Sequence, residues 1–71
     1  MNTFNPKKLL NSKWTAVTPV NKALHFIVTE LHFDADRHVT FCVLEAVINQ
    51  QTFVLPPTSL KESSIWMQGW C

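Results

Sequence analysis

The sequence predicts a single small domain that is mainly β, with four antiparallel strands connected as a meander. The chain has 71 residues, which is enough for one hydrophobic core. Its apolar residues alternate along several segments rich in Val, Thr and aromatic side chains, which is typical of half-buried strands. The gaps between these segments contain Pro, Asn and Asp, which favour turns, and the chain has one glycine.

An N-terminal arm of residues 1–11 is expected before a core that spans residues 12–70. Asn5 can cap a short helical turn that begins at Pro6, because proline suits the first helical position. The first strand follows at 13–18. It ends at a proline, which cannot donate a hydrogen bond within a sheet.

Two long strands are predicted at 24–33 and 39–48, and the aspartates between them favour a turn. In both strands the apolar residues change face about halfway along the hairpin. Either bulges re-aim both strands, or the tip of the hairpin buries one face while its base buries the other. Both alternatives describe a long, twisted hairpin that contributes to two packed layers.

The fourth strand is predicted at 51–55, after a tight turn at Asn49-Gln50 that places Ala46 opposite Phe53. Prolines end this strand. The capping-box spacing of the segment 59–62 then predicts one helical or 3₁₀ turn. These short helical turns lie near the two ends of the chain. A last turn, closed by the single glycine, is expected near the C-terminus.

Four such strands are expected to curl into a small SH3-like barrel. The alternative is an open antiparallel sheet whose bare face dimerises. The tryptophans lie at the two ends of the predicted core, and each can bury on the order of 200 Å² of surface. Trp14 and Trp66 are expected to be core residues. Trp70 is either pinned in a groove as a clasp or exposed as a contact residue.

The charges are unevenly distributed along the chain. Residues 1–29 carry four lysines and no acid, a charge of +4, whereas residues 30–71 carry two bases and five acids, a charge of −3. Glu45 lies within an apolar strand, where it either faces solvent or pairs with a lysine or an indole N–H. The candidate binding residues are therefore Lys7, Lys8, Lys13, Lys22, Glu45, Trp66 and Trp70.

No catalytic residue, cofactor or metal is predicted. The segment His32, Asp34, Asp36 and His38 has the residue types of a metal site, but the chain reverses there and polar hairpin tips are usually solvated. Cys42 is expected to pack in the core as a small apolar residue. His25 could lie near it, but no third group would orient such a pair, so an enzyme is not expected.

The segment Ser12-Lys13-Trp14-Thr15-Ala16-Val17 and the closing Trp66-Met67-Gln68-Gly69-Trp70 resemble the small tryptophan-rich family of bacterial proteins, a domain of unknown function. The chain departs from that family's pattern at Pro56-Pro57, where a Pro-Trp pair is usual, and at Glu62-Ser63, where an acid and Pro are common. The resemblance covers nearly the whole chain and implies no activity.

The sequence favours a non-enzymatic binding module that contacts a protein or peptide through an aromatic surface. One alternative is single-stranded nucleic-acid binding through tryptophan and the N-terminal lysines. Another is a self-associating structural protein, with a homodimer as its product. No signal peptide is evident and no apolar run approaches the roughly 20 residues that span a bilayer, so a cytoplasmic protein without a membrane partner is expected.

Overall fold

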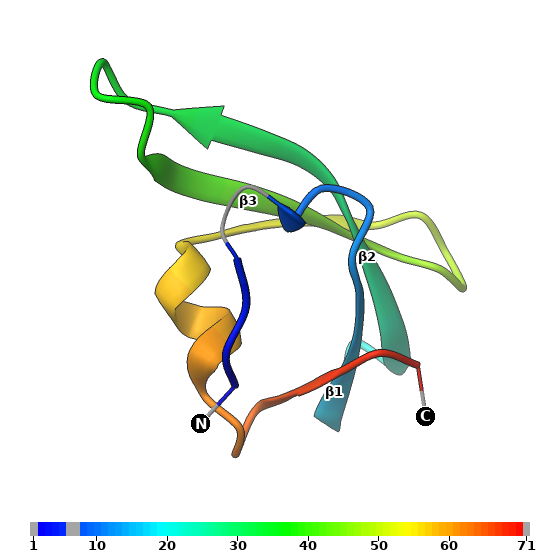
Figure 1. Ribbon diagram of the computed structural model, residues 1–71. Coiled ribbons are helices and arrows are strands. Elements are labelled where there is room, and N and C mark those ends of the chain that lie inside the picture. Colours follow the sequence, from blue (N-terminus) through cyan, green and yellow to red (C-terminus); the bar gives the residue numbers. More distant parts are fainter. Residues whose placement is uncertain (1, 6–7, 71) are drawn as a thin grey trace.

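The computed structural model describes residues 2–5 and 8–70, which form one antiparallel sheet of five strands with little helix (Figure 1). The strand order is β4-β3-β2-β1-β5. The elements in chain order are β1 (Lys13–Val20), β2 (Ala23–Phe33), β3 (Val39–Ala46), β4 (Thr52–Leu55), the 3₁₀ helix η2 (Pro57–Lys61) and β5 (Trp66–Gln68).

The mainly β class, the first four strands and the 3₁₀ turn before the final segment agree with the sequence prediction. The prediction of four strands was wrong, because residues 66–68 form β5 rather than a turn. β5 pairs with β1, with Trp66 opposite Ala16 and Gln68 opposite Trp14. Among the described residues β4 and β5 do not pair, so the sheet is not closed and the expected barrel is not seen.

A bulge in β2 explains why the apolar pattern changes face. Val28 pairs with Leu44, whereas Glu30 pairs with Val43, so Thr29 is an extra residue on β2. One inserted residue turns every later side chain to the other face. A second shift lies near the hairpin tip. The β2 half of the first alternative, a bulge that re-aims the strand, is therefore seen. In β3 no bulge lies at the middle of the hairpin, and Cys42, Leu44 and Ala46 keep the same buried face.

The loop between β3 and β4 is longer than the expected two-residue turn. Phe53 pairs with Leu44 and not with Ala46. Gln50 has a left-handed φ of 59°, and its N–H donates to the Ala46 carbonyl (2.8 Å). The side chain of Asn49 accepts a backbone N–H within the same loop (3.0 Å). The pairing of β3 with β4 is therefore shifted by two residues from the predicted register. Because side chains alternate with a period of two, each side chain of β4 still lies on the face that was predicted.

The core lies on the concave side of the sheet and is completed by the N-terminal arm and η2. Phe26 lies at its centre and makes edge-to-face contacts with Phe53 (5.8 Å between centroids) and Trp66 (5.2 Å). Cys42 is fully buried, and burial raises the pKa of its thiol, which keeps it protonated. The buried apolar residues are Leu9, Trp14, Ala16, Ala23, Phe26, Val28, Cys42, Leu44, Ala46, Leu60 and Trp66.

The N-terminal segment covers the outer edge of β5. The Asn2 side chain donates hydrogen bonds to the carbonyls of Trp66 (2.7 Å) and Leu60 (2.9 Å), and the Gln68 side chain donates to the carbonyl of Thr3. In Figure 1 this segment runs beside η2 and the start of β5. A protein strand therefore cannot add at β5 unless this segment moves. Of the expected turn at Asn5-Pro6, the described part shows the Lys8 N–H donating to the Asn5 carbonyl (2.8 Å), and Pro6 lies outside the described residues.

Candidate functional site

Trp70 is placed by a sharp change of direction after β5. Gly69 has a φ of +80°, which suits glycine, and its N–H donates to the Lys13 carbonyl (2.8 Å). The Trp70 indole Nε1 then donates to the carbonyl of Phe26 (3.0 Å). Its ring lies beside the His25 imidazole (6.0 Å between centroids), and the Lys13 ammonium lies 4.9 Å from the ring centroid. Trp70 is therefore pinned to β1 and β2.

The same side chain is also available to a partner, because Trp70 is 45% exposed. The two expectations for Trp70, a clasp and a contact residue, are thus compatible in one position. The hydrogen bond and the lysine hold the ring, while nearly half of its surface faces solvent. A ring that is already held loses little conformational freedom when a partner packs against it.

A shallow groove of about 380 Å³ lies next to the Trp70 ring at the sheet end, and His25, which contacts the ring, is one of its lining residues. Its lining residues come from the start of β2 and from the loop after β3, which are joined by the Val47 N–H donating to the His25 carbonyl (3.0 Å). Three of them are exposed aliphatic side chains, and Ile48 is 72% exposed. We call this region the Trp70 surface; it consists of Lys13, Lys22, Leu24, His25, Val47, Ile48 and Trp70.

The structure brings only some of the predicted site residues together. Lys13 and Lys22 belong to the Trp70 surface. Trp66 is 6% exposed and lies in the core. Lys8 is exposed but does not line the groove, and Lys7 lies outside the described residues.

Glu45 shares a row with Lys13 on the outer face of the sheet, because both residues stand level with Ile27. The two strands are separated by β2, which places their backbones about 10 Å apart. Within the described chain the Glu45 carboxylate makes no ion pair with Lys13 or Lys22, and the Trp70 indole N–H binds the Phe26 carbonyl instead. The pairing that the sequence suggested for Glu45 is therefore not formed.

Sequence reasoning missed the apolar part of this surface. Val47 and Ile48 were expected to continue a strand, but β3 ends at Ala46 and the loop exposes both side chains. His25 was considered only as a neighbour of Cys42. The two lie on opposite faces of the sheet, since Cys42 is in the core and His25 contacts the Trp70 ring on the other side.

We expect Trp70→Ala to lower the free energy of unfolding by about 1–2 kcal/mol, because it removes a half-buried ring and one hydrogen bond. Urea denaturation measures this change. Trp70→Phe keeps most of the ring area but loses the indole N–H, and it should lie between the wild type and Trp70→Ala. If Trp70→Ala leaves the unfolding free energy unchanged, the ring is not a clasp.

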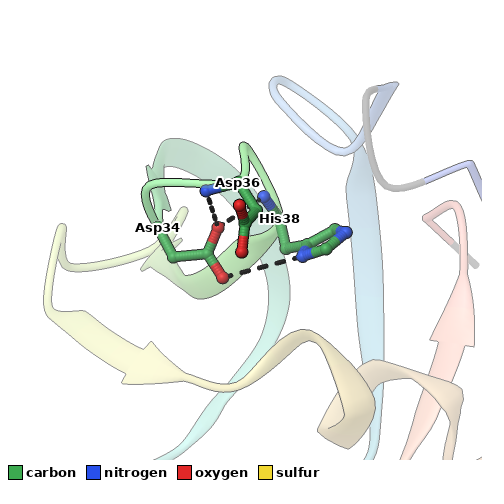
Figure 2. A group of neighbouring side chains, drawn as sticks. All are labelled: Asp34, Asp36 and His38. Carbon is green, nitrogen blue, oxygen red and sulfur yellow. Dashed lines mark hydrogen bonds and ion pairs between the residues drawn. The ribbon is translucent and has the colours of Figure 1, made fainter.

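At the tip of the β2–β3 hairpin, Asp34, Asp36 and His38 converge (Figure 2), with candidate ligand atoms within 4.8 Å of one another. One Asp34 carboxylate oxygen accepts the backbone N–H groups of Asp36 (2.9 Å) and His38 (2.9 Å), and the other lies 3.7 Å from His38 Nδ1. His32 is not part of this group, and its Nε2 lies 3.5 Å from Oε2 of Glu30. The Asp34 carboxylate thus holds an exposed turn by accepting these two backbone N–H groups, and the side chains of Asp36 and His38 lie beside it.

The Asp34 carboxyl gives this turn a pH dependence. The hydrogen bond from the His38 backbone N–H, together with that from Asp36, holds the pKa of Asp34 below its usual value. Its contribution to stability is therefore present above the usual Asp pKa of about 4 and is lost as pH falls through the lower folded-state pKa. We expect Asp34→Asn to flatten the pH dependence of the melting temperature in acid. Asp36→Asn, which removes no such acceptor, should keep the wild-type dependence.

The fold and the Trp70 surface define a small open β-sheet domain with a pinned, half-exposed tryptophan beside Lys13. The chain belongs to the tryptophan-rich protein family (DUF2389), whose model matches residues 12–71. This match confirms the resemblance seen in the sequence. No curated protein and no solved structure matches the chain. Among the described residues no helix has the length and apolar character needed to cross a bilayer.

Proposed function

We propose that this protein is a small non-enzymatic binding module that contacts a protein or peptide through the Trp70 surface. The observation that carries the proposal is that the Trp70 ring is held by the Phe26 carbonyl and by Lys13 while 45% of the residue remains exposed. Tryptophan side chains often dominate the binding energy of protein interfaces. A fixed ring next to exposed aliphatic side chains has the features of such a contact.

The charge around the groove indicates the chemistry of the partner. Lys22 lines the groove together with the aliphatic residues Leu24, Val47 and Ile48. Lys13 lies over the Trp70 ring. A segment with one or two apolar side chains beside an aspartate or glutamate would complement both features. We therefore propose a partner segment that is apolar and acidic.

Single-stranded nucleic acid fits this surface less well. A base that stacks on the face of the Trp70 ring covered by Lys13 would displace its ammonium, which lies 4.9 Å from the ring centroid. The surface also contains two of the four N-terminal lysines, Lys13 and Lys22, so few phosphates would be neutralised there.

Selection from a library of displayed random peptides tests the proposal. We expect the selected peptides to combine apolar and acidic residues and to shift the ¹⁵N amide signals of His25 and Val47 and the indole signal of Trp70. Ile48→Glu should weaken binding at least tenfold, about 1.4 kcal/mol, because it places a negative charge in the groove. Val54→Glu is the matched control: Val54 is also an exposed aliphatic residue, but it lies on β4 and should tolerate the change.

Two outcomes would replace this proposal. If peptides fail to bind while a thymidine 12-mer binds with a salt slope of roughly −2 to −3, the protein binds single-stranded nucleic acid. If sedimentation shows a dimer that Ile48→Glu converts to a monomer, the Trp70 surface is its own self-association contact. Equal loss of peptide binding in Ile48→Glu and Val54→Glu would show that the groove is not the contact.

A further inference from the structure

We infer that a second site, between the tip of the β2–β3 hairpin and η2, binds a small phosphate monoester. A pocket of about 300 Å³ lies between these elements. It shares no residue with the Trp70 surface, so the two sites are independent. Its lining residues are Arg37, His38 and Val39 of the hairpin, Pro57, Thr58 and Lys61 of η2, and Asn5.

The pocket concentrates positive charge. Arg37 and Lys61 both line it and no acidic residue does, although the whole protein has a net charge of only +1. Two carboxylates lie beside the pocket without lining it, because Asp34 and Asp36 cluster with His38 and one Asp34 oxygen lies 3.7 Å from His38 Nδ1. Glu62 follows η2 and does not line the pocket either. An anion that enters therefore meets the positive charges of Arg37 and Lys61, whereas the His38 imidazole already faces the Asp34 carboxylate.

The cationic residues are positioned by two separate elements. Arg37 has a left-handed φ of 63°, and its N–H donates to the Asp34 carbonyl (3.0 Å), so the turn holds its backbone in place. Figure 2 shows the His38 imidazole beside the turn, with Nδ1 3.7 Å from one oxygen of the Asp34 carboxylate. Lys61 ends η2, and its ammonium lies 5.8 Å from the centroid of the Phe4 ring. The charges thus face one pocket from opposite sides.

The residues that line the pocket favour a phosphate monoester over a carboxylate. A phosphate monoester carries close to two negative charges near neutral pH, which matches Arg37 and Lys61, whereas a carboxylate would neutralise only one of them. The arginine guanidinium can donate two parallel hydrogen bonds to phosphate oxygens, and the Thr58 hydroxyl adds a further donor. Val39 and Pro57 provide an apolar wall for the esterified group. The pocket volume, at the lower end of ligand sites, limits the ligand to a small molecule.

Titration of the ¹⁵N-labelled protein with phenyl phosphate, benzoate and inorganic phosphate tests this inference. Phenyl phosphate should shift the amide signals of His38, Val39 and Thr58, and it should bind at least tenfold more tightly than benzoate. Inorganic phosphate should bind more weakly than phenyl phosphate, because it lacks the apolar group. Binding should also weaken as salt is added.

Arg37→Gln and Lys61→Gln should each weaken phenyl phosphate binding at least tenfold. Both residues are exposed, so the variants should keep the wild-type melting temperature. Lys22→Gln is the matched control, since it removes a lysine from the Trp70 surface, and it should bind within twofold of the wild type. The inference is overturned if no saturable shift occurs up to about 10 mM phenyl phosphate. Equal binding of benzoate, or equal loss in Lys22→Gln, overturns it as well.

Discussion

Trp14→Ala is expected to lower the free energy of unfolding by about 3–5 kcal/mol, the range measured when a buried aromatic residue is replaced by alanine. Trp14 is 1% exposed, and its ring contacts the edge of Phe4 (5.8 Å between centroids). Its indole Nε1 donates to the Ser12 hydroxyl (2.9 Å). The substitution would open a cavity where the N-terminal arm meets the sheet.

Thermal and urea unfolding measure this effect. A domain of this size loses roughly 4–8 °C in melting temperature for each kcal/mol, so Trp14→Ala should be largely unfolded at 37 °C or melt far below the wild type. Ser12→Ala keeps the ring but removes the acceptor of its indole N–H together with the hydrogen bond from the Ser12 hydroxyl to the Leu9 carbonyl, and it should cost about 1–2 kcal/mol. A cooperative melt of Trp14→Ala within a few degrees of the wild type would show that the ring is not part of the core.

Trp66→Ala should have an effect of similar size, about 3–5 kcal/mol, although Trp66 lies in a strand of only three residues. Its ring makes an edge-to-face contact with Phe26 (5.2 Å), and its carbonyl accepts the Asn2 side chain (2.7 Å). Loss of the ring would therefore weaken both the core and the attachment of β5.

The neighbouring Met67→Ala is the control for Trp66→Ala. Met67 is exposed on the same strand, and its replacement should change the unfolding free energy by less than about 1 kcal/mol. The difference between Trp66→Ala and Trp70→Ala is equally informative, because one ring is in the core and the other is half exposed. Equal losses in these two variants would contradict the distinction between core and surface tryptophans.

The candidate site was only partly predictable from the sequence. Trp70 could be named because aromatic residues are enriched in binding surfaces. Lys13 and Lys22 could be named because the lysines gather in the N-terminal part of the sequence, where no acidic residue balances their charge. The aliphatic residues beside them could not, because Val47 and Ile48 belong to a loop whose length the sequence did not reveal. Their proximity to His25 depends on a backbone hydrogen bond between two different segments.

The short strand β5 was missed for a similar reason. Three residues are too few for alternation to show a period, and Trp66-Met67-Gln68 is equally consistent with a turn. β5 becomes a strand because Thr15 and Met67 pair across the sheet. Local sequence pattern could not show whether the sheet closes into a barrel, because closure requires the two edge strands, β4 and β5, to pair. Within the described residues these strands do not pair.

Local pattern in the sequence determined the β class, the first four strands and the change of buried face along β2, because side-chain alternation reports directly which face of a strand is buried. Only the tertiary structure shows that β4 and β5 are the edge strands of the sheet, and only it brings the residues of the Trp70 surface together. The Asn2 side chain donates a hydrogen bond to the carbonyl of Trp66, which is 64 residues away in the sequence. The Trp70 indole donates to the carbonyl of Phe26, which is 44 residues away. Contacts between residues so distant in sequence depend on the curvature of the whole sheet, which no short segment encodes.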